Sequence, residues 1–432
     1  MLTIATMLKR FLTIASGALV GTVLAFTAAN FASAWGLWPN RELDRSSSYV
    51  KQVMELVAEN YVDGTKAGYD QLTKSALHGL LESLDPHSEF LEARDFKELE
   101  EDMNAEFGGI GVQVEMREGR VVVIAPIAGT PGDRAGIQRG DAIVAVDGKR
   151  LEKSPMNDVI DHLRGKPRSR VTVQFFRPST KREFEVTLVR EIIKVESVRD
   201  VRLLPDRIGY LQLTQFSERT GAEFGEALKK LAAQGMSALV LDLRNNPGGL
   251  LDAAVEVSEP FFNKGELIVY TQGRDPKDRE EFLAESRRPA LAVPVVVLIN
   301  AGTASAAEIV AGALRDTRKA VIVGERSFGK GSVQSIFQLK NGEGLRLTTA
   351  RYYTPSGVTI HEKGVDPQVN VVMTPEEDSQ LRLQRSRSDV TDAKEFVDRF
   401  GFTPIADRQL DAAVEVARGL LAWGERTGAA PH

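Results

Sequence analysis

A serine and a lysine that each follow a β-rich segment have the residue types and placement of a catalytic pair. Ser305 lies between a β-branched run at 294–300 and a segment at 304–314 whose apolar residues recur at helical spacing. The first backbone N–H groups of a helix have no intrahelical partner, so the N–H of Ala306 is available to an oxyanion that develops beside the serine. Ser305 is therefore a candidate nucleophile for attack on a carbonyl carbon.

Lys330 is the candidate base for this serine. It follows a short β-branched segment at 320–324, and the strand expected at 332–339 would place Gln334 on the same face as the lysine. A lysine amine accepts a proton only when it is neutral, which requires burial or a nearby positive charge to lower its pKa from roughly 10.4. We expect the Gln334 carbonyl oxygen to accept a hydrogen bond from the amine and orient it.

A glycine pair is the expected second oxyanion donor. The strand at 238–243 leads into a loop that contains Gly248 and Gly249, and adjacent glycines let backbone N–H groups approach a ligand closely. Strands and helices alternate from 195 to 373, which predicts an α/β core. Ligands of open α/β sheets gather beyond the carboxyl ends of the strands, so the loops that carry these residues should converge.

Length and composition bound the other possibilities. A chain of 432 residues is long enough for two or three domains, and its net charge of −5 gives no basic footprint for nucleic acid. The absence of cysteine excludes disulfides, thiolate metal sites and a cysteine nucleophile. His87 lies among acidic residues, but the chain has no HExxH motif and no further ligand cluster. Neither a metal nor a cofactor is expected.

The N-terminus predicts export. Lys9 and Arg10 precede an apolar stretch at 11–29, and small residues at 32–34 follow it. The first interpretation of residues 1–34 is a cleaved secretory signal. The alternative is an uncleaved inner-membrane anchor, because the apolar stretch is close to spanning length. Either interpretation places the rest of the chain in the periplasm.

The remaining sequence divides into four regions. They are a helical N-terminal region at 40–104, a β-rich module at 105–190, the α/β core at 195–373 and a helical C-terminal region at 374–432. Within the module, residues 128–137 and 140–148 resemble a bacterial PDZ domain, and Gly109, Ile110, Gly111 and Val112 are similar to its carboxylate-binding loop. Consecutive N–H groups in such a loop can hold a terminal carboxylate while the next strand pairs with the peptide.

Five motifs in order resemble the C-terminal processing peptidases, also called tail-specific proteases, over nearly the whole mature chain. They are SLDPHS at 83–88, DLRNNPGG at 242–249, GTASAAE at 302–308, FGKGSVQ at 328–334 and YYTPSG at 352–357. The resemblance implies a multidomain α/β protein, in which helical appendages flank a ClpP/crotonase-like protease core with an inserted PDZ domain. It also implies protein substrates with free C-terminal tails, a homo-oligomer and an adaptor lipoprotein as partner.

The same resemblance implies a role for each candidate residue. Ser305 would be the nucleophile, Lys330 the general base and Gln334 its orienting partner, with an acyl-enzyme intermediate. Ala306 and a glycine of the 248/249 pair would form the oxyanion hole. Arg164 would sense occupancy of the PDZ domain and couple it to the protease.

Two rival interpretations stay open. His361 is the histidine within the core, but a Ser/His/Asp hydrolase would have glycines where this chain has Thr303 and Ala307. A binding protein is the rival from another class: a catalytically idle PDZ scaffold or chaperone of the cell envelope. The joint presence of Ser305, Lys330 and Gln334 favours the serine endopeptidase.

Overall fold

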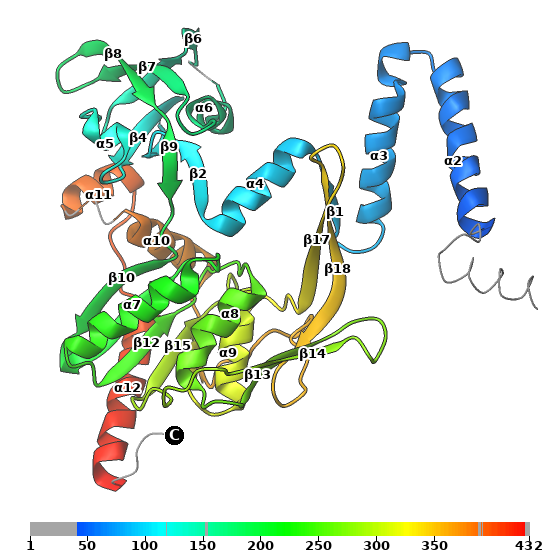
Figure 1. The fold of residues 1–432 in the computed structure, drawn as a ribbon. Helices are drawn as coiled ribbons and strands as arrows, with labels where there is room; N and C mark the ends of the chain where they lie inside the picture. Colours follow the sequence, from blue (N-terminus) through cyan, green and yellow to red (C-terminus); the bar gives the residue numbers. More distant parts are fainter. Residues whose placement is uncertain (1–40, 118, 152–153, 388–389, 391, 428–432) are drawn as a thin grey trace, which may run out of the picture. The chain divides into compact units, whose positions relative to one another are not determined.

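The computed structural model describes residues 41–427 except 118, 152–153, 388–389 and 391 (Figure 1). The expected signal segment at 1–34 lies outside the described residues. The chain divides into two compact units, 1–84 and 85–432. In the described part of the chain, no helix combines the length and apolarity that crossing a membrane requires.

The first unit contains a helical hairpin. Helix α2 spans Arg41–Asn60, a 3₁₀ turn spans Gly64–Lys66, and helix α3 spans Tyr69–Glu82. The apolar residues of α2 recur at helical spacing, yet the structure buries none of its side chains.

A six-stranded sheet forms the centre of the second unit, with the order β10-β11-β12-β15-β16-β19. Its strands are Val198–Leu204, Ile208–Leu213, Ala238–Asp242, Val295–Ile299, Val321–Gly324 and Val369–Asn370. β10 and β11 are antiparallel and the other neighbours are parallel. The loops after β12, β15 and β16 therefore leave the same edge of the sheet.

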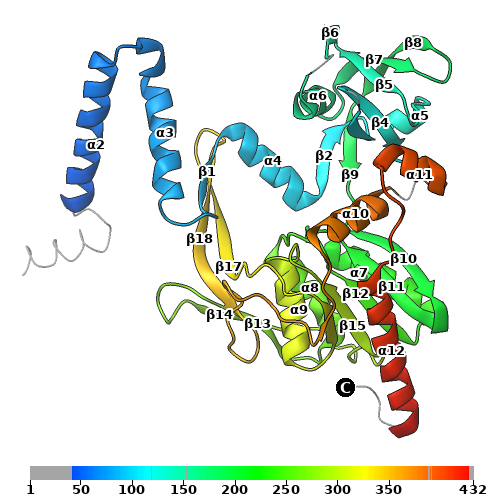
Figure 2. The ribbon, with the colours of Figure 1, turned by 180° about the vertical axis from the view of Figure 1, so that it is seen from behind.

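Helices cover both faces of this sheet (Figures 1 and 2). Alternate side chains such as Leu241 and Val297 pack against helices α7 (Thr220–Ala233), α8 (Leu251–Ser258) and α9 (Ala306–Asp316). The intervening side chains face the opposite layer, where helix α12 (Arg408–Thr427) contributes Ala413 and Ala417. The C-terminal helix is thus one layer of the core, because strands buried on both faces need apolar cover on each.

A second sheet lies beside the core and has the order β1-β18-β13-β14, with β17 paired to β18. Its strands are Glu89–Leu91, Gly344–Tyr353, Leu267–Gln272, Arg279–Leu283 and, for β17, Ser332–Gln338. β1 pairs with the start of β18, although some 250 residues separate the two strands in sequence. The segment after residue 84 is thereby fixed beside the β17–β18 hairpin.

Helix α4 (Ala93–Asn104) leads from β1 to a β-rich module. The module's sheet contains β3 (Val112–Arg117), β4 (Arg120–Pro126), β5 (Ala142–Val146), β6 (Lys149–Arg150), β7 (Arg170–Arg177) and β8 (Arg182–Val189). Helices α5 (Pro131–Arg134) and α6 (Met156–Leu163) complete it. It has its own core around Val146, Val173 and Phe175. A ribbon of β2 (Glu106–Gly109) and β9 (Glu191–Lys194) joins both of its ends to the rest of the unit.

Helices α10 (Pro375–Ser386) and α11 (Ala393–Phe400) precede α12. The multidomain α/β architecture expected from the sequence is confirmed.

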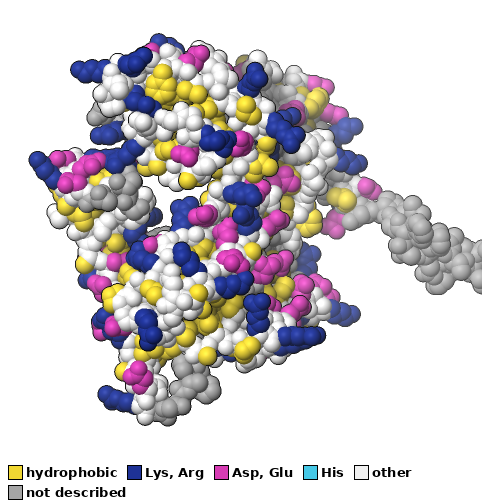
Figure 3. All heavy atoms as spheres, turned by 60° about the vertical axis from the view of Figure 1, so that its left-hand side comes forward, with side chains coloured by type: hydrophobic (Ala, Val, Ile, Leu, Met, Phe, Trp, Pro, Cys, Tyr) yellow, Lys and Arg dark blue, Asp and Glu magenta, His cyan; other side chains and the backbone are white. Residues whose placement is uncertain are grey.

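On the face shown in Figure 3, basic and acidic side chains are interspersed rather than gathered by sign.

Candidate active site

One cavity of about 690 Å³ brings the expected catalytic residues together beyond the carboxyl ends of the parallel strands. Ser305, Lys330 and Gln334 line it, and so do the oxyanion candidates Gly248, Gly249 and Ala306. We call it the Ser305 cavity. Much of its remaining wall is apolar and includes Leu99, Met103, Phe216, Leu251, Ile309 and Val333.

Ser305 is the residue that immediately precedes helix α9, and its backbone is strained. Its φ of 56° and ψ of −120° lie in a region that residues with a side chain rarely adopt, as happens at functional sites. Its Oγ lies 2.9 Å from the hydroxyl oxygen of Tyr352. Burial raises the pKa of Tyr352, so the phenol stays neutral and can donate to the serine oxygen. The serine proton then remains available to a base.

Two backbone N–H groups beside Ser305 are free to bind an oxyanion. Within the described part of the chain, neither Ala306 nor Gly249 donates its backbone N–H to a protein acceptor. The N–H of Gly248 instead donates to Asn246 Oδ1 at 2.8 Å. A β-carbon on Gly248 would lie 2.6 Å from the Ser305 β-carbon, so only glycine allows this loop to approach the serine. Of the two glycines, Gly249 thus has the available donor.

The surroundings of Lys330 favour its neutral form. Burial lowers the pKa of Lys330, and the positive charge of Arg346 lowers it further, whereas Glu89 and Asp85 act in the opposite direction. Arg346 Nη2 is itself 2.7 Å from Glu89 Oε1. The amine is therefore suited to accept a proton at a pH below the usual titration range of lysine.

This balance of charges predicts opposite pH shifts for two variants. Arg346→Gln removes a positive charge, raises the pKa of Lys330 and should move the acidic limb of the kcat/KM profile to higher pH. Glu89→Gln removes a negative charge, lowers that pKa and should move the limb to lower pH. The measurement is kcat/KM as a function of pH for wild type and both variants. Shifts in the same direction would contradict a base that titrates beside these two groups.

Gln334 differs from the expectation in its hydrogen bonds. Its Nε2 donates to Thr348 Oγ1 at 2.8 Å and to Ser332 Oγ at 3.1 Å. Its Oε1 is buried and has no donor, so the expected bond from Lys330 is not formed in this structure. β17 also has a register shift between Val333 and Gln334, so strict alternation along the strand does not set the direction of the Gln334 side chain.

A buried carboxylate joins the two halves of the site. Glu308 is fully buried, and its Oε2 accepts the N–H of Ser305 at 2.9 Å and the N–H of Lys330 at 2.8 Å. Its Oε1 accepts the Gly329 N–H at 2.7 Å and the Ser327 hydroxyl at 2.5 Å. Burial raises the pKa of Glu308, and these hydrogen bonds oppose the rise. One side chain thus fixes the backbone of both candidate catalytic residues.

Glu308 and Tyr352 lie within the sequence motifs, but the sequence alone assigns them no role at the site. A glutamate within an apolar helical segment was a signal, because charged residues are rarely fully buried without partners. The partners of Glu308 lie up to 22 residues away, and Tyr352 is 47 residues from Ser305. No local pattern shows such contacts.

Neither histidine candidate takes part in the Ser305 cavity as a lining residue. The backbone of His361 packs against Gly331, and its Nδ1 is buried without a partner. His87 donates its backbone N–H to Asp85 Oδ1 at 2.8 Å in a tight turn. Among the described residues, no group of three or more His, Asp or Glu side chains is arranged to hold a metal ion.

The loop expected to bind a carboxylate comprises residues 109–112 of the module. The carbonyl of Ile110 accepts the Gly132 N–H and that of Gly111 accepts the Ile127 N–H, while the N–H groups of both loop residues have no acceptor among the described residues. Gly111 has a φ of 72°, and a β-carbon there would lie 2.3 Å from the Thr130 side chain. Val112 begins strand β3.

Arg164 follows helix α6 and contacts the segment that leads to the module. Its guanidinium carbon lies 4.6 Å from the centre of the Phe107 ring, and its Nη1 lies 3.9 Å from Glu101 Oε2 on α4. Helix α4 also lines the Ser305 cavity through Leu99 and Met103. Arg164 thus contacts an element that reaches the candidate active site.

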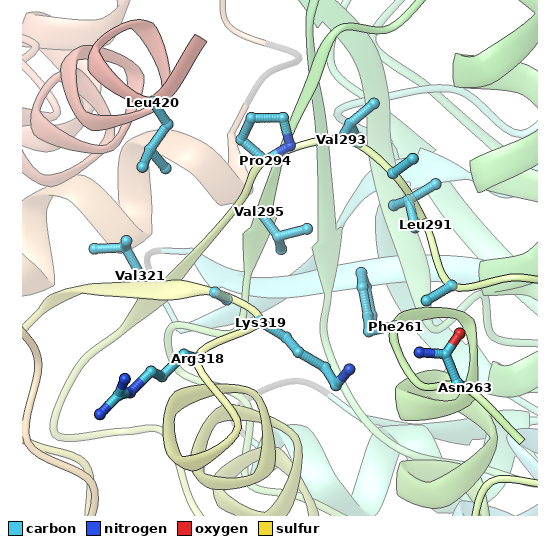
Figure 4. A pocket seen from close by; sticks show the side chains of 13 residues that line it. Phe261, Asn263, Leu291, Val293, Pro294, Val295, Arg318, Lys319, Val321 and Leu420 are labelled. Atoms are coloured by element: carbon cyan, nitrogen blue, oxygen red, sulfur yellow. The ribbon is translucent and has the colours of Figure 1, made fainter. Parts of the chain in front are cut away.

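A second cavity, of about 250 Å³, lies near the starts of β15 and β16 (Figure 4). Phe261, Leu291 and Val295 contribute apolar surface, and Lys319 extends along one side. Lys319 Nζ is paired with Glu266 Oε2 at 2.9 Å. This cavity contains none of the candidate catalytic residues, so we assign the chemistry to the Ser305 cavity.

Comparisons with known proteins show which families the chain resembles. Residues 207–371 match peptidase family S41, and residues 108–188 match the PDZ domain family. A carboxy-terminal-processing protease from Bartonella bacilliformis is 43% identical over 323 residues, which cover 74% of this chain and 73% of that protein. The carboxy-terminal processing protease CtpA from Bacillus subtilis is 34% identical over 363 residues, which cover 84% of this chain and 77% of that protein.

Among solved structures, the photosystem II D1 C-terminal processing protease matches with a TM-score of 0.43 and 32% identity, over 74% of this chain and 92% of that chain. The extent and identity of the sequence matches establish the relationship. The chain therefore belongs to peptidase family S41, as a serine-type C-terminal processing protease that carries a PDZ domain.

Proposed function

We propose that this protein is an exported serine endopeptidase that binds free C-terminal tails of proteins through its PDZ domain and cleaves them with a Ser305/Lys330 dyad. The observation that carries the proposal is the Ser305 cavity, where a strained serine, a lysine of lowered pKa and two free backbone N–H groups meet. A catalytically idle scaffold would need none of these features.

In the proposed reaction the neutral Lys330 amine takes the proton of Ser305 Oγ as that oxygen attacks the substrate carbonyl. The N–H groups of Ala306 and Gly249 stabilise the resulting oxyanion. When the C–N bond breaks, the Lys330 ammonium returns the proton to the leaving amine, and Ser305 holds the acyl group as an ester. Water, deprotonated by the same amine, then hydrolyses the ester and frees the serine.

Export and assembly belong to the proposal as well. The basic and apolar pattern of residues 1–34 supports passage into the periplasm, as a cleaved secretory signal rather than an uncleaved anchor. The family resemblance supports a homo-oligomer and an adaptor lipoprotein. Arg164, through its contacts with α4, is the proposed link between tail binding and the protease.

The dyad and the tail specificity can be tested with one pair of substrates. The substrates are an unfolded protein with an apolar free C-terminus and the same protein with that terminus amidated. Wild type should cleave the free-acid form faster, and Ser305→Ala and Lys330→Ala should abolish cleavage of both forms. His361→Ala should retain activity. Equal activity in the two dyad variants and wild type would rule out the dyad, and a loss only in His361→Ala would favour the histidine scheme.

Gly111→Asp tests the PDZ loop in the same assay. The substitution strains a residue at φ 72°, collides with Thr130 and adds a negative charge where a carboxylate should bind. Gly119→Asp is the matched control, because Gly119 has a φ of 74° with no atom within 4 Å of an added β-carbon. Gly111→Asp should remove the preference for the free-acid substrate and Gly119→Asp should retain it. If wild type cleaves both substrates equally, the PDZ loop has no role in tail recognition.

A further inference from the structure

We propose that the turn formed by Asp85, Pro86, His87 and Ser88 is a positioning element of the catalytic centre. In this proposal Asp85 and Ser88 hold Thr348, and Thr348 orients the Gln334 amide so that Oε1 faces the Lys330 amine. The proposal rests on the proposed function, in which Lys330 is the base. It assigns a role to the SLDPHS motif, which the reaction above leaves without one.

The turn is closed by the Asp85 carboxylate. Its Oδ1 accepts the N–H groups of His87 at 2.8 Å and Ser88 at 2.9 Å, and its Oδ2 accepts the Ser88 hydroxyl at 2.9 Å. Burial would raise the pKa of Asp85, but these hydrogen bonds together lower it. The carboxylate is therefore ionised near neutral pH and can only accept hydrogen bonds. Ser88 is 3% exposed, so this end of the turn is buried in the second unit, whereas Asp85 and His87 are half-buried and Pro86 is exposed.

The turn fixes Thr348 across 260 residues of sequence. Because the Ser88 hydroxyl donates its proton to Asp85, its oxygen acts as an acceptor, and it receives the Thr348 N–H at 3.1 Å. The Thr348 hydroxyl oxygen lies 3.5 Å from Ser88 Oγ, and the interaction of this hydroxyl with the Asp85 carboxylate helps to lower the pKa of that group. The Thr348 proton is thus directed toward Asp85, which leaves its oxygen to accept a hydrogen bond from another group.

The Gln334 amide is that other group. Its Nε2 donates to Thr348 Oγ1 at 2.8 Å and to Ser332 Oγ at 3.1 Å, so both amide protons are used. The two donations determine which end of the amide is nitrogen and leave Oε1 buried without a donor. A buried carbonyl oxygen without a partner is costly and calls for a donor. The chain of bonds from Asp85 therefore fixes the direction of the Gln334 amide.

Lys330 supplies the matching donor. Its amine lines the same cavity as Gln334 and has no hydrogen-bond acceptor among the described residues. The charges of Arg346, Glu89 and Asp85 shift the pKa of Lys330. The charge of Lys330 in turn lowers the pKa of His87. A bond from the amine to Gln334 Oε1 would direct the nitrogen lone pair toward the serine. Arg346 Nε is a second buried donor without a partner at this cavity. The pH dependence of activity distinguishes Lys330 from Arg346 as the donor to Gln334 Oε1.

The test compares Thr348→Val with Thr348→Ser. Valine preserves the shape of the side chain but removes the acceptor of Gln334 Nε2, so the amide loses its fixed direction. We expect kcat to fall about tenfold or more with KM within about twofold, because the base is misdirected while the binding surface remains. The acidic limb of the pH profile should move to lower pH, because an oxygen that favours the charged amine no longer faces it. Thr348→Ser, which keeps the hydroxyl, should have the kcat and the acidic limb of wild type.

Ser88→Ala is the second variant. It removes the acceptor of the Thr348 N–H at the far end of the chain and should change kcat and the pH profile in the same direction, by less. An unchanged pH profile in Thr348→Val would overturn the proposal, whether that variant retains its activity or loses it to the same extent as Thr348→Ser. The same result would follow if Gln334 Oε1 accepts a hydrogen bond from Arg346 rather than from Lys330. Lys330→Ala is measured alongside: activity remaining in that variant would refute the dyad itself, which is a distinct result.

Discussion

Glu308→Gln is expected to lower kcat about 100-fold or more while the protein stays folded, because small displacements of catalytic groups have effects of this size. The Glu308 carboxylate accepts four hydrogen bonds, two of them from the N–H groups of Ser305 and Lys330. A glutamine has the same shape but only one acceptor oxygen. Its NH₂ group must face a backbone N–H, whichever way the amide turns.

The physical result is a buried donor without a partner, at a cost of about 1–3 kcal/mol. Relief of that cost moves either the Ser305 backbone or the loop at 327–330, so the nucleophile and the base lose their relative position. The measurement is kcat for protein cleavage, with far-ultraviolet circular dichroism to show that the variant is folded. Glu226→Gln is the matched control, because this exposed carboxylate pairs with Lys229 on the surface of α7. A folded Glu308→Gln protein with activity like that of Glu226→Gln would show that Glu308 does not position the site.

Arg244→Met is expected to reduce the free energy of unfolding by about 3–5 kcal/mol, as the loss of one partner from a buried ion pair does. Arg244 Nη2 lies 2.8 Å from Asp242 Oδ2, and its Nη1 lies 2.7 Å from Asp407 Oδ1, with the arginine side chain 2% exposed. Burial alone would raise the pKa of Asp242, but Arg244 and Arg385 hold it well below its usual range. Removal of Arg244 deprives the Asp242 and Asp407 carboxylates of a positively charged partner.

The loss of Arg244 should also affect the active site, because this side chain connects the start of α12 to the loop that carries Gly248 and Gly249. Asp407 immediately precedes α12 and accepts the N–H of Leu410, whereas Arg244 itself begins the loop that carries Gly248 and Gly249. Urea unfolding should therefore report a large loss of stability. Arg418→Met is the control, because Arg418 is exposed and pairs with Asp206 and Glu415 at the surface, where such pairs contribute about 0–1 kcal/mol. Equal midpoints and slopes for the two variants would contradict the account of this cluster.

The sequence predicted the parts of the site that depend on local pattern. The β-branched run at 294–300 and the helical spacing at 304–314 correspond to β15 and α9, and Ser305 lies between them. The α/β alternation also predicted that the three loops leave one edge of the sheet. These features follow from periods of two and 3.6 residues, which a single segment displays by itself.

The sequence did not predict the individual hydrogen bonds between side chains and distant segments. Glu308 stands out in the sequence as a charged residue within an apolar helical segment, but its role depends on a loop some twenty residues later. The register shift at Gln334 has no signature in the residues themselves, yet it affects where the amide points. The sequence predicts a helical region at 374–432, but not that its last helix is one layer of the core, because the small buried residues Ala413 and Ala417 mark a packed face only against the sheet.

The most direct test of the central claim is the site and pH dependence of covalent labelling by a fluorophosphonate, located by mass spectrometry of peptides. Our account predicts a label on Ser305, at a rate that rises with pH as the Lys330 amine loses its proton. Lys330→Ala should leave Ser305 unlabelled although the protein is folded. A label on another residue, or labelling of Lys330→Ala at the wild-type rate, would contradict the dyad.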